Sequence, residues 1–579
     1  MKSMPLSEAI TRHVRPGMHL NFASTPSRSN AAILELCRQF RGRAPGFELS
    51  ATGFHSLAHL LVKLQLGRRY IACFFGDNYP SPRPNRLYRS ALARGDELEH
   101  WSLWSYVSAL RAGALGHPYA VTNSLAGTSL GAALSRLGKF WQLPDPADAT
   151  KSLGLVAAIV PDLTFVHAVA ADAAGNVLFA PPFSEGLHGA LAARQGVIAT
   201  VECVLDSAEV AAFPELIALP SQRILAVCEE PFGAHPQPLH FAPAQPRVRT
   251  YRDDYEHYEL WSRLADGSQS FADFEGVLEA EQGGAAYREF VGEARLQSLK
   301  TPAGRIRTIR TKPASKPTNR PVAHELNAAE RLILLAARAI ARRVSVRAHS
   351  CILAGLGQSF TAVRLAKLIL GEQPDGAPEV MVETGFAAMD VEYSRSFLLS
   401  QENVATAQRL GSVEAMLGAL TCGANNRCLG VIGAAQVDVS GNVNSSFADG
   451  EFLVGSGGAS DIASSAAEVM VLAPCDARRL LREVEYVTSP GHSVLTVVTD
   501  RCTLERASRT GPWTVTELAP GLGVHGAEQE IASRCPWSLT FPDSLGASPP
   551  PSELEWRFLM NLNEPAARAL SAGGARANV

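Results

Sequence analysis

The sequence lacks the features that mark a membrane, secreted or nucleic-acid-binding protein. No apolar run approaches the roughly 18 residues needed to cross a bilayer. The first 22 residues mix charged and apolar side chains, unlike an export signal. Lys plus Arg (53) nearly balances Asp plus Glu (56), whereas nucleic-acid binding usually shows a basic excess. We therefore expect a cytoplasmic protein with no membrane and no nucleic-acid partner.

Metal-ligand patterns are also missing. The chain has 10 cysteines, but no two of them show CxxC spacing, and the nearest pair, Cys422 and Cys428, has no clustered histidine. This number is ordinary for 579 residues, so we expect most of the thiols to pack as small apolar side chains. The sequence predicts neither a disulfide framework nor a metal site.

What the chain does contain is a series of short apolar runs separated by helix-like stretches. Such runs, rich in Val and Ile, suit parallel strands that are covered on both faces. They are Leu153–Val160, Leu163–Ala170, Gly196–Val201, Ile224–Cys228, Cys351–Leu356, Val380–Val382, Leu429–Ala435, Val469–Ala473 and Val494–Val498. Helices are expected over Asn30–Phe40, over Ser359–Leu370 and after Asn327, where the two asparagines are capping-type residues. The alternation predicts an α/β fold.

A basic segment divides the chain. Between Lys300 and Arg320 the sequence has seven basic residues, three prolines and no acidic residue. Such composition is typical of a solvated linker, and a nucleic-acid or membrane arm is the alternative interpretation. We predict an N-terminal domain over 1–298, a linker over 299–325, a second domain over 326–547 and a tail over 548–579.

The two sides of the linker resemble each other. Asp172-Ala-Ala-Gly-Asn-Val177 in the first half is matched by Asp438-Val-Ser-Gly-Asn-Val443 in the second. Each motif follows an apolar run and precedes a small-residue turn and an alanine-rich helix, and each reads as a tight Gly-containing turn. The repetition predicts two related open α/β domains with mainly parallel sheets and helices on both faces.

Two glycine-rich segments could approach a ligand closely. Gly355 and Gly357 follow a strand and open a helix, but the third glycine of a dinucleotide fingerprint is missing, which disfavours nicotinamide chemistry. Gly457-Gly458-Ala-Ser-Asp461 can present backbone N–H groups to an oxyanion. A plain packing turn is the alternative for this segment.

Glu383 lies at the end of an apolar strand and is followed at once by a Gly-containing turn. Ligands bind outside the carboxyl ends of parallel strands, so this carboxylate could act as a nucleophile or base, although helix capping is the more common role at such a place. His167 reads as a satisfied core histidine. Tyr79, His100 and Trp101 could line a substrate pocket or pack in an interface.

Several motifs in the same order resemble a known family. In the second half these are VETG around Glu383, GAAQVDVSGNVNSSF (433–447), GSGGASDIASSA (455–466) and YVTSPGH (486–492). They resemble the β subunit of family I CoA-transferases, most closely the glutaconate CoA-transferase branch. The first half resembles the matching α subunit through YPSPRPNRLYRSALARG, WSLWSYVSALRAGALGHP, VHAVAADAAGNV and SEGLHGALAARQGVIATVE. The resemblance implies α-like and β-like halves fused in one chain.

The resemblance also implies roles for single residues. Glu383 matches the family's catalytic glutamate. Gly457, Gly458, Ala459 and Asp461 match the GGA-x-D turn that contacts CoA and helps to form the oxyanion hole, and Gln436 matches a position near the reacting carbonyl. Gly355 and Gly357 are candidate CoA-binding positions. The family's α-side G-G-F segment is replaced here by Asn21-Phe-Ala-Ser, where Asn21 is the candidate contribution.

The implied function is transfer of CoA from an acyl-CoA to a small carboxylic acid, by ping-pong chemistry through a glutamyl-CoA thioester. CoA would be a co-substrate, with no permanently bound cofactor and no metal, and the family suggests a homo-oligomer. An acyl-CoA hydrolase, possibly ring-opening, or a decarboxylase on the same fold is the alternative. A metabolite-sensing module whose basic segment binds nucleic acid is a third interpretation.

Overall fold

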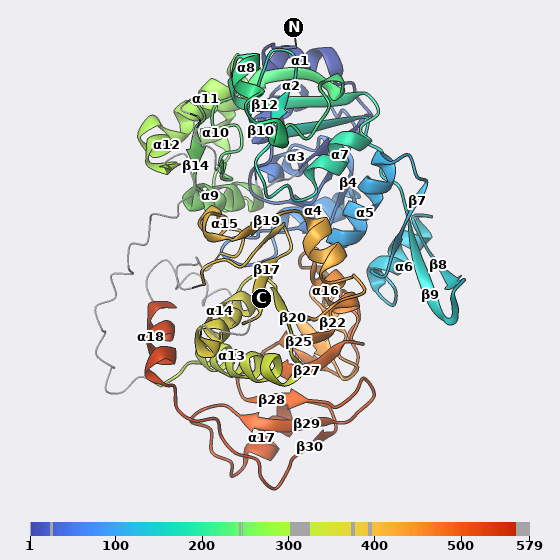
Figure 1. Ribbon diagram of the computed structural model, residues 1–579, viewed down its shortest axis with the longest axis vertical. Helices are drawn as coiled ribbons and strands as arrows, with labels where there is room; N and C mark the ends of the chain where they lie inside the picture. The colour runs from blue at the N-terminus through green and yellow to red at the C-terminus, as the bar shows by residue number, and fades with distance from the viewer. Residues whose placement is uncertain are drawn as a thin grey trace.

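The computed structural model describes residues 2–23, 27–241, 245, 247–301, 325–371, 377–391 and 397–562. Two open sheets, one from each half of the chain, form the upper and lower parts of the molecule in Figure 1. Most of the expected basic linker (302–324) and the end of the tail (563–579) lie outside the described residues. The domain boundaries therefore stay a prediction.

The N-terminal sheet has the strand order β13-β12-β10-β1-β2-β4-β6, and every neighbouring pair along this path is parallel. All nine residues of β10 are buried, which explains its continuous apolar sequence. Three of the expected apolar strands are confirmed here as β10, β12 and β13. The strands are β1 (His19–Phe22), β2 (Phe47–Ala51), β4 (Gly67–Ala72), β6 (Glu97–His100), β10 (Leu163–Ala171), β12 (Gly196–Val204) and β13 (Ile224–Glu229).

The C-terminal sheet has the order β19-β18-β17-β16-β20-β25-β27-β28-β29-β30. Its central strands β17 to β27 are parallel. They confirm the five apolar runs that were expected in this half. The strands are β16 (Cys351–Ala354), β17 (Glu379–Val382), β18 (Phe386–Ala387), β19 (Arg409–Leu410), β20 (Cys428–Gly433), β25 (Glu468–Leu472), β27 (Val494–Val498), β28 (Cys502–Glu505), β29 (Trp513–Leu518) and β30 (Leu539–Thr540).

The duplication expected from the sequence is visible in the topology and in one local motif. The order β2-β1-β10-β12-β13 in the first sheet repeats as β17-β16-β20-β25-β27 in the second. After β10, one carboxylate oxygen of Asp172 accepts the N–H of Asn176, and after β21 (Gln436–Asp438) Asp438 accepts the N–H of Asn442, both at 2.9 Å. The glycine before each asparagine has a positive φ (96° and 85°), as the turn requires.

The expected helices form, with one change at an end. They are α2 (Asn30–Phe40), α13 (Ala328–Arg347) and α14 (Gln358–Leu370). Asn327 caps α13 in a reciprocal box with Glu330, as expected. The prediction that Asn30 caps α2 is wrong: Ser29 is the cap position, and the Asn30 amide donates to the Ala234 carbonyl at 2.7 Å. The Asn30 side chain therefore makes a tertiary hydrogen bond and does not cap its own helix.

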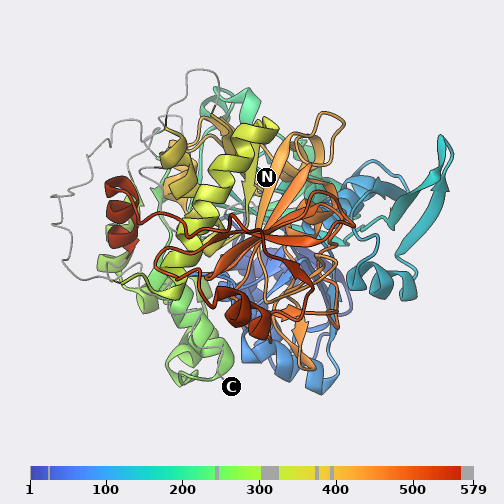
Figure 2. The same cartoon turned by 90° about the horizontal axis from the view of Figure 1, so that it is seen from below.

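A three-stranded antiparallel sheet projects from the body of the molecule (Figures 1 and 2). It has the order β7-β9-β8, from β7 (Tyr119–Thr122), β8 (Phe140–Asp145) and β9 (Asp148–Ala157). The expectation of a covered parallel strand at Leu153–Val160 is therefore wrong. We refer to this sheet as the arm. It is preceded by α5 (Leu103–Ala114), which lies against the C-terminal half.

The two halves share a core. One buried apolar cluster contains Trp101 and Tyr106 from the first half and Met416 and Leu417 from the second. At the far end, α18 (Glu553–Leu562) is held to α13 by a bidentate ion pair between Arg338 and Glu555 at 2.8 Å. Nine of the 10 cysteines are buried and all are free, as expected. No helix within the described ranges has both the length and the apolar composition to span a bilayer.

Candidate active site

A cavity of about 470 Å³ lies between the halves, at the carboxyl ends of the parallel strands of both sheets. The first half contributes residues that follow β2 and β4, among them Thr52 and Cys73. The second half contributes Glu383 after β17, Gly355 after β16 and Gly433 at the end of β20. The carboxyl ends of the strands in both sheets therefore face one shared cavity. This is the edge of a parallel sheet at which α/β proteins bind ligands.

Glu383 is the first residue beyond β17, and its half-buried side chain lines this cavity. The turn that follows is fixed by glycine. Gly385 has a φ of +113°, and a Cβ at this position would lie 2.7 Å from the carbonyl oxygen of Gly411. No other residue fits this turn without strain, so the Glu-Thr-Gly order aims the carboxylate into the cavity.

Gly458 packs directly against this carboxylate. A Cβ built on Gly458 would lie only 2.0 Å from Oε2 of Glu383, so any side chain there would displace the acid. The backbone N–H group of Gly458 acts to lower the pKa of the carboxyl group. The glycine is thus required by close packing, and its backbone supplies a donor where negative charge is held.

The surroundings make the charged form of Glu383 costly. Burial raises the pKa of Glu383 to about 7, the negative charge of nearby Asp461 acts in the same direction, and the Gly458 N–H opposes them. Hydration normally stabilises a carboxylate and weakens it as a nucleophile. A desolvated carboxylate beside a single backbone donor is correspondingly more reactive toward a carbonyl carbon.

Asp461 does not line the cavity but joins the two halves behind it. It is fully buried in α16 (Ala459–Ser465), and its Oδ1 accepts the hydroxyl of Ser102 at 2.6 Å, while Oδ2 accepts the N–H of Trp104 at 2.9 Å. Ser102 is the N-cap of α5. The carbonyl of Gly457 also accepts the N–H of Leu103 at 3.0 Å. The start of α5 therefore holds the segment that contacts Glu383.

The other predicted oxyanion donors are used inside the protein. The N–H of Gly457 donates to the carbonyl of Cys73 at 2.9 Å, and the N–H of Ala459 donates to Ser456 at 3.1 Å. Both residues still line the cavity with Gly458. Among the backbone N–H groups of this glycine-rich segment, that of Gly458 is the one that acts on the pKa of Glu383.

Gln436 and Asn21 are buried in polar networks outside the cavity wall. The Oε1 atom of Gln436 accepts the amide of Asn444 at 2.9 Å. The Oδ1 atom of Asn21 accepts the hydroxyls of Ser50 and Tyr106 at 3.0 and 2.9 Å. Neither side chain belongs to the lining. The roles that the resemblance implies for them, Gln436 near the reacting carbonyl and Asn21 as a contribution from the first half, stay predictions.

Gly355 and Gly357 do line the cavity, as expected for a ligand-binding loop. Gly357 precedes α14, has a φ of +80° and leaves the helix without a side-chain cap. The next turn contributes Gln358 and Ser359 to the same wall. The hydroxyl of Ser359 is buried and has no hydrogen-bond partner among the described residues.

Tyr79, His100 and Trp101, which could have lined a substrate pocket or packed in an interface, pack against other residues and do not line the cavity. Tyr79 stacks on Tyr255 with ring centroids 4.7 Å apart, and His100 packs against Phe452 of the other half at 5.0 Å. Trp101 is buried in the core that the halves share. His167 is a satisfied core residue, as expected, because its two nitrogens pair with Thr200 and Glu202.

The polar wall residues that the sequence analysis missed include Asn78, Gln237, Asp253 and Arg479. Asn78 directly precedes the Tyr79-Pro-Ser-Pro segment, which was the available signal. Arg479 donates to the carbonyl of Ala435 at 3.0 Å, and its guanidinium forms no ion pair within the described part of the chain. The other two residues lie in stretches without a recognisable motif.

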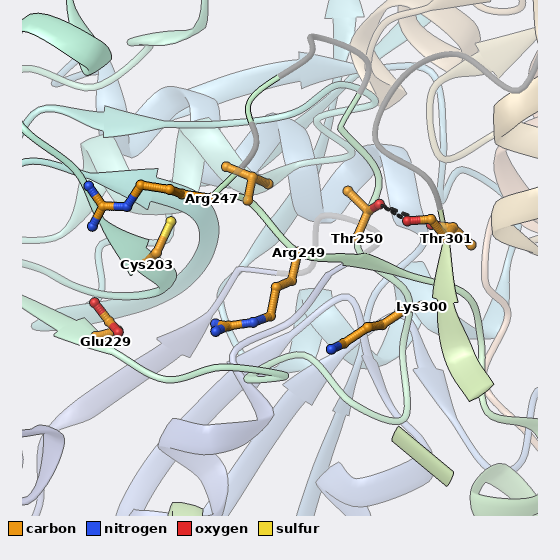
Figure 3. Close-up of a pocket in the computed structure, with 8 residues that line it drawn as sticks. Cys203, Glu229, Arg247, Arg249, Thr250, Lys300 and Thr301 are labelled. Carbon is orange, nitrogen blue, oxygen red and sulfur yellow. Dashed lines mark hydrogen bonds between the residues drawn. The ribbon is translucent and has the colours of Figure 1, made fainter. Parts of the chain in front are cut away.

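A second cavity of about 460 Å³ lies at the ends of β12 and β13 (Figure 3). Arg247, Arg249 and Lys300 give it a basic lining, together with Glu229 and Cys203. Burial raises the pKa of the Cys203 thiol to about 11, so the thiol stays protonated near neutral pH. The Cys203 thiol of this cavity is therefore not prepared for nucleophilic chemistry.

One cluster has the residue types of a metal site, but an arginine already pairs with its carboxylate. His235, Asp254 and His257 bring ligand atoms within 4.8 Å of one another. The Asp254 carboxylate, however, pairs with Arg295 through two hydrogen bonds of 2.9 and 2.7 Å and also contacts both histidines. The guanidinium occupies the side of the carboxylate that a cation would need.

Comparisons with known proteins agree with this geometry. Residues 4–228 match the family model described as Coenzyme A transferase. Subunits A and B of 3-oxoadipate CoA-transferase from Pseudomonas knackmussii are 33% identical over 177 residues and 28% identical over 167 residues. These matches cover 30% and 25% of this chain. The chain spans 56% and 61% of the length of these two curated relatives.

A solved structure resembles the whole molecule. The acyl-CoA transferase YdiF from Escherichia coli O157:H7 superposes with a TM-score of 0.62 over 98% of this chain and 97% of its own, at 14% sequence identity. This likeness establishes the fold. The sequence matches are similarities of parts of the chain: the Coenzyme A transferase model matches within the first half, and the two relatives are two different subunits of one enzyme.

Proposed function

We propose that the protein transfers CoA from an acyl-CoA to a small carboxylic acid through Glu383. The observation that carries this proposal is the contact of the Glu383 carboxylate with Gly458 inside the cavity that both halves line. The match of residues 4–228 to the Coenzyme A transferase model and the names of the two relatives support the same reaction class. We further propose that the protein acts in the cytoplasm as a homo-oligomer.

In the proposed mechanism, a Glu383 oxygen attacks the thioester carbonyl of the acyl-CoA. The carbon–sulfur bond breaks, CoA leaves as the thiolate, and an acyl-glutamyl anhydride forms. The thiolate then attacks the glutamyl carbonyl, which gives a glutamyl-CoA thioester and releases the first acid as its carboxylate. A second carboxylate accepts the CoA by the same steps in reverse, so the kinetics are ping-pong.

The residues around Glu383 would serve this chemistry in distinct ways. Gly458 supplies a donor to the glutamyl oxygen and leaves room for the carboxylate. The enclosed position between the halves limits the access of water, to which both the anhydride and the thioester are labile. Binding of the long CoA away from the reacting atoms can contribute to the anhydride steps.

The direct test is mass spectrometry of the intact protein and its peptides after incubation with an acyl-CoA and no acceptor. We expect a CoA adduct on the peptide that contains Glu383, and none in Glu383→Gln. Turnover without an adduct on this peptide would contradict the mechanism. Free CoA released at a rate that is independent of acceptor would indicate the hydrolase alternative, and carbon dioxide would indicate the decarboxylase.

A further inference from the structure

The second cavity, at the ends of β12 and β13, has about the same volume as the cavity between the halves and shares no lining residue with it. Its described lining contains three basic side chains and one carboxylate, so it is positively charged, whereas the whole chain has a formal net charge of −3. No step of the proposed transfer uses this cavity. A cavity lined by charge of one sign concentrates ions of the opposite sign.

Two of its four charged side chains already have partners. One guanidinium nitrogen of Arg247 forms an ion pair with Glu209 at 3.1 Å, and the other donates to the Val204 carbonyl at 2.7 Å. The Oε2 atom of Glu229 accepts the N–H of Val204 at 2.8 Å. Arg247 and Glu229 are thus both fixed to the last residue of β12, and the charge of Arg247 is balanced by Glu209.

Arg249 and Lys300 have no such partner. Arg249 donates to the carbonyl of Glu202 over 3.5 Å, which is beyond the usual length of a hydrogen bond, and Lys300 lies 6.0 Å from the ring centre of Phe232. Neither cation forms an ion pair with a carboxylate of the described residues. Both residues are exposed, and Figure 3 shows their side chains extending in the same direction. Two cations of this cavity therefore remain available to an anion.

The backbone that carries these two cations is well fixed. β14 (Thr250–Tyr251) and β15 (Lys300–Thr301) pair as antiparallel strands. The hydroxyls of the two threonines also form a hydrogen bond of 3.0 Å with each other (Figure 3). Arg249 directly precedes β14, and Lys300 begins β15. The strand pair therefore holds cations from distant positions of the chain beside one cavity.

The chemistry of this lining suits an anion with more than one negative charge. An arginine presents a planar fork of N–H donors to carboxylate or phosphate oxygens, and a lysine supplies a compact charge. Two cations without a carboxylate partner match a divalent ligand better than a monovalent one. The volume of about 460 Å³ is typical of small-molecule sites. The protonated Cys203 thiol makes this a place for binding and not for covalent chemistry.

We propose that this cavity binds a small anion with at least two negative charges, held by Arg249 and Lys300. A phosphorylated metabolite and a polycarboxylate share this chemistry. Binding there is independent of the proposed transfer of CoA, because the cavity that contains Glu383 has a different lining.

The test is isothermal titration calorimetry of the full chain with pyrophosphate in one arm and citrate in the other. We expect saturable binding of at least one of them, and the tighter ligand identifies the source of the anion. In Arg249→Gln combined with Lys300→Gln, the affinity should fall about tenfold or more. Arg427→Gln combined with Arg482→Gln, at two exposed arginines of the second half, changes the net charge equally and should keep the wild-type affinity.

Failure of both anions to bind the wild-type protein would overturn the proposal. Binding that both double variants retain would place the anion elsewhere, such as beside Glu383, and an equal loss in both would indicate only a general effect of charge; either result overturns the proposal. Acetate, which is monovalent, should bind about tenfold more weakly or less, and equal affinity for acetate would contradict a site for two charges. Thermal unfolding checks that the first double variant is folded, and its two single substitutions repeat the test if it is not.

Discussion

At the scale of single residues, the proposed chemistry depends on the protonation state of Glu383. Only the carboxylate can attack, and burial raises its pKa to about 7. We therefore expect kcat/KM for an acyl-CoA to rise with pH and to level off above about pH 7, which initial rates between pH 5 and 9 would show. A midpoint near the ordinary glutamate value of 4.5 would contradict the desolvated environment.

The same raised pKa makes Glu383 a source of instability at high pH. The folded protein holds the proton more tightly than the unfolded chain, so this contribution to stability is complete below about pH 4.5 and is lost as the pH rises through 7. Glu383→Gln removes the titration. We expect this variant to be more stable than the wild type at pH 8, by at most about 3 kcal/mol, and equally stable near pH 4.5.

Denaturant unfolding at both pH values measures the difference. Glu379→Gln, on the strand that precedes Glu383, is the matched control. The side chain of Glu379 is exposed and forms an ion pair with Arg409 at the surface. A Glu383→Gln variant that is less stable than the wild type at pH 8 would show that the carboxylate has a compensating partner.

Gly458 offers a test of the close approach to the nucleophile. A methyl group at this position would lie 2.0 Å from the carboxylate oxygen, so Gly458→Ala should displace Glu383 and lower kcat by about a hundredfold or more. Gly523→Ala is the control, because no atom lies within 4 Å of a Cβ there. Comparable rates for the two variants would contradict the assignment of the site.

At the scale of secondary-structure elements, α5 positions a segment of the opposite half. Ser102 caps this helix and binds Asp461, so Ser102→Ala should loosen the segment that contains Gly458. We expect kcat to fall about tenfold, with a smaller change in KM and a loss of roughly 1 kcal/mol in stability.

Thr128→Ala, at the N-cap of α6 (Ser129–Arg136), is the matched control. It should cost about as much stability without changing kcat. Steady-state kinetics together with thermal unfolding would distinguish the two variants. Equal losses of activity would mean that α5 acts only through global stability.

At the scale of the whole molecule, the arm exposes an apolar face. Val121 and Trp141 are 59% and 37% exposed, and both align with Leu155 of β9 across the sheet. Contiguous exposed apolar surface is typical of an association site. With the expected homo-oligomer, this predicts that a second copy covers the arm.

Sedimentation velocity can check this prediction. Val121→Lys combined with Trp141→Lys should shift the protein to a smaller species. Val346→Lys, at a 72% exposed valine on α13, should leave the assembly unchanged. A wild-type protein that sediments as a monomer would contradict the prediction.

Much of the fold could be predicted because parallel strands covered on both faces need uninterrupted apolar sequence. All but one of the expected apolar runs became strands of the two parallel sheets, and both Asp-x-x-Gly-Asn turns formed the same hydrogen bonds. The prediction of a covered parallel strand at Leu153–Val160 was wrong because this part of the arm is also apolar. Its neighbouring strands are antiparallel and one face of the arm is exposed. Local composition does not distinguish these two surroundings.

The candidate site was predicted in part. Glu383 and Gly458 were found because the end of a strand and a glycine-rich motif can be recognised from neighbouring residues in the sequence. The structure places both residues at the cavity. Asp461 belongs to the same motif, yet its carboxylate binds Ser102 and Trp104, more than 350 positions away. Asn78 and Gln237 were missed because only the folded chain shows which residues of distant segments line the same cavity.

The amino-acid order alone thus determined the apolar strands, the repeated turns and the carboxylate at a strand end, since each depends on residues within a few positions of one another. The tertiary structure decided which of the polar groups face the shared cavity and which are consumed in holding the halves together. That division depends on contacts between residues hundreds of positions apart, because burial, and with it the pKa of Glu383, is a property of packing.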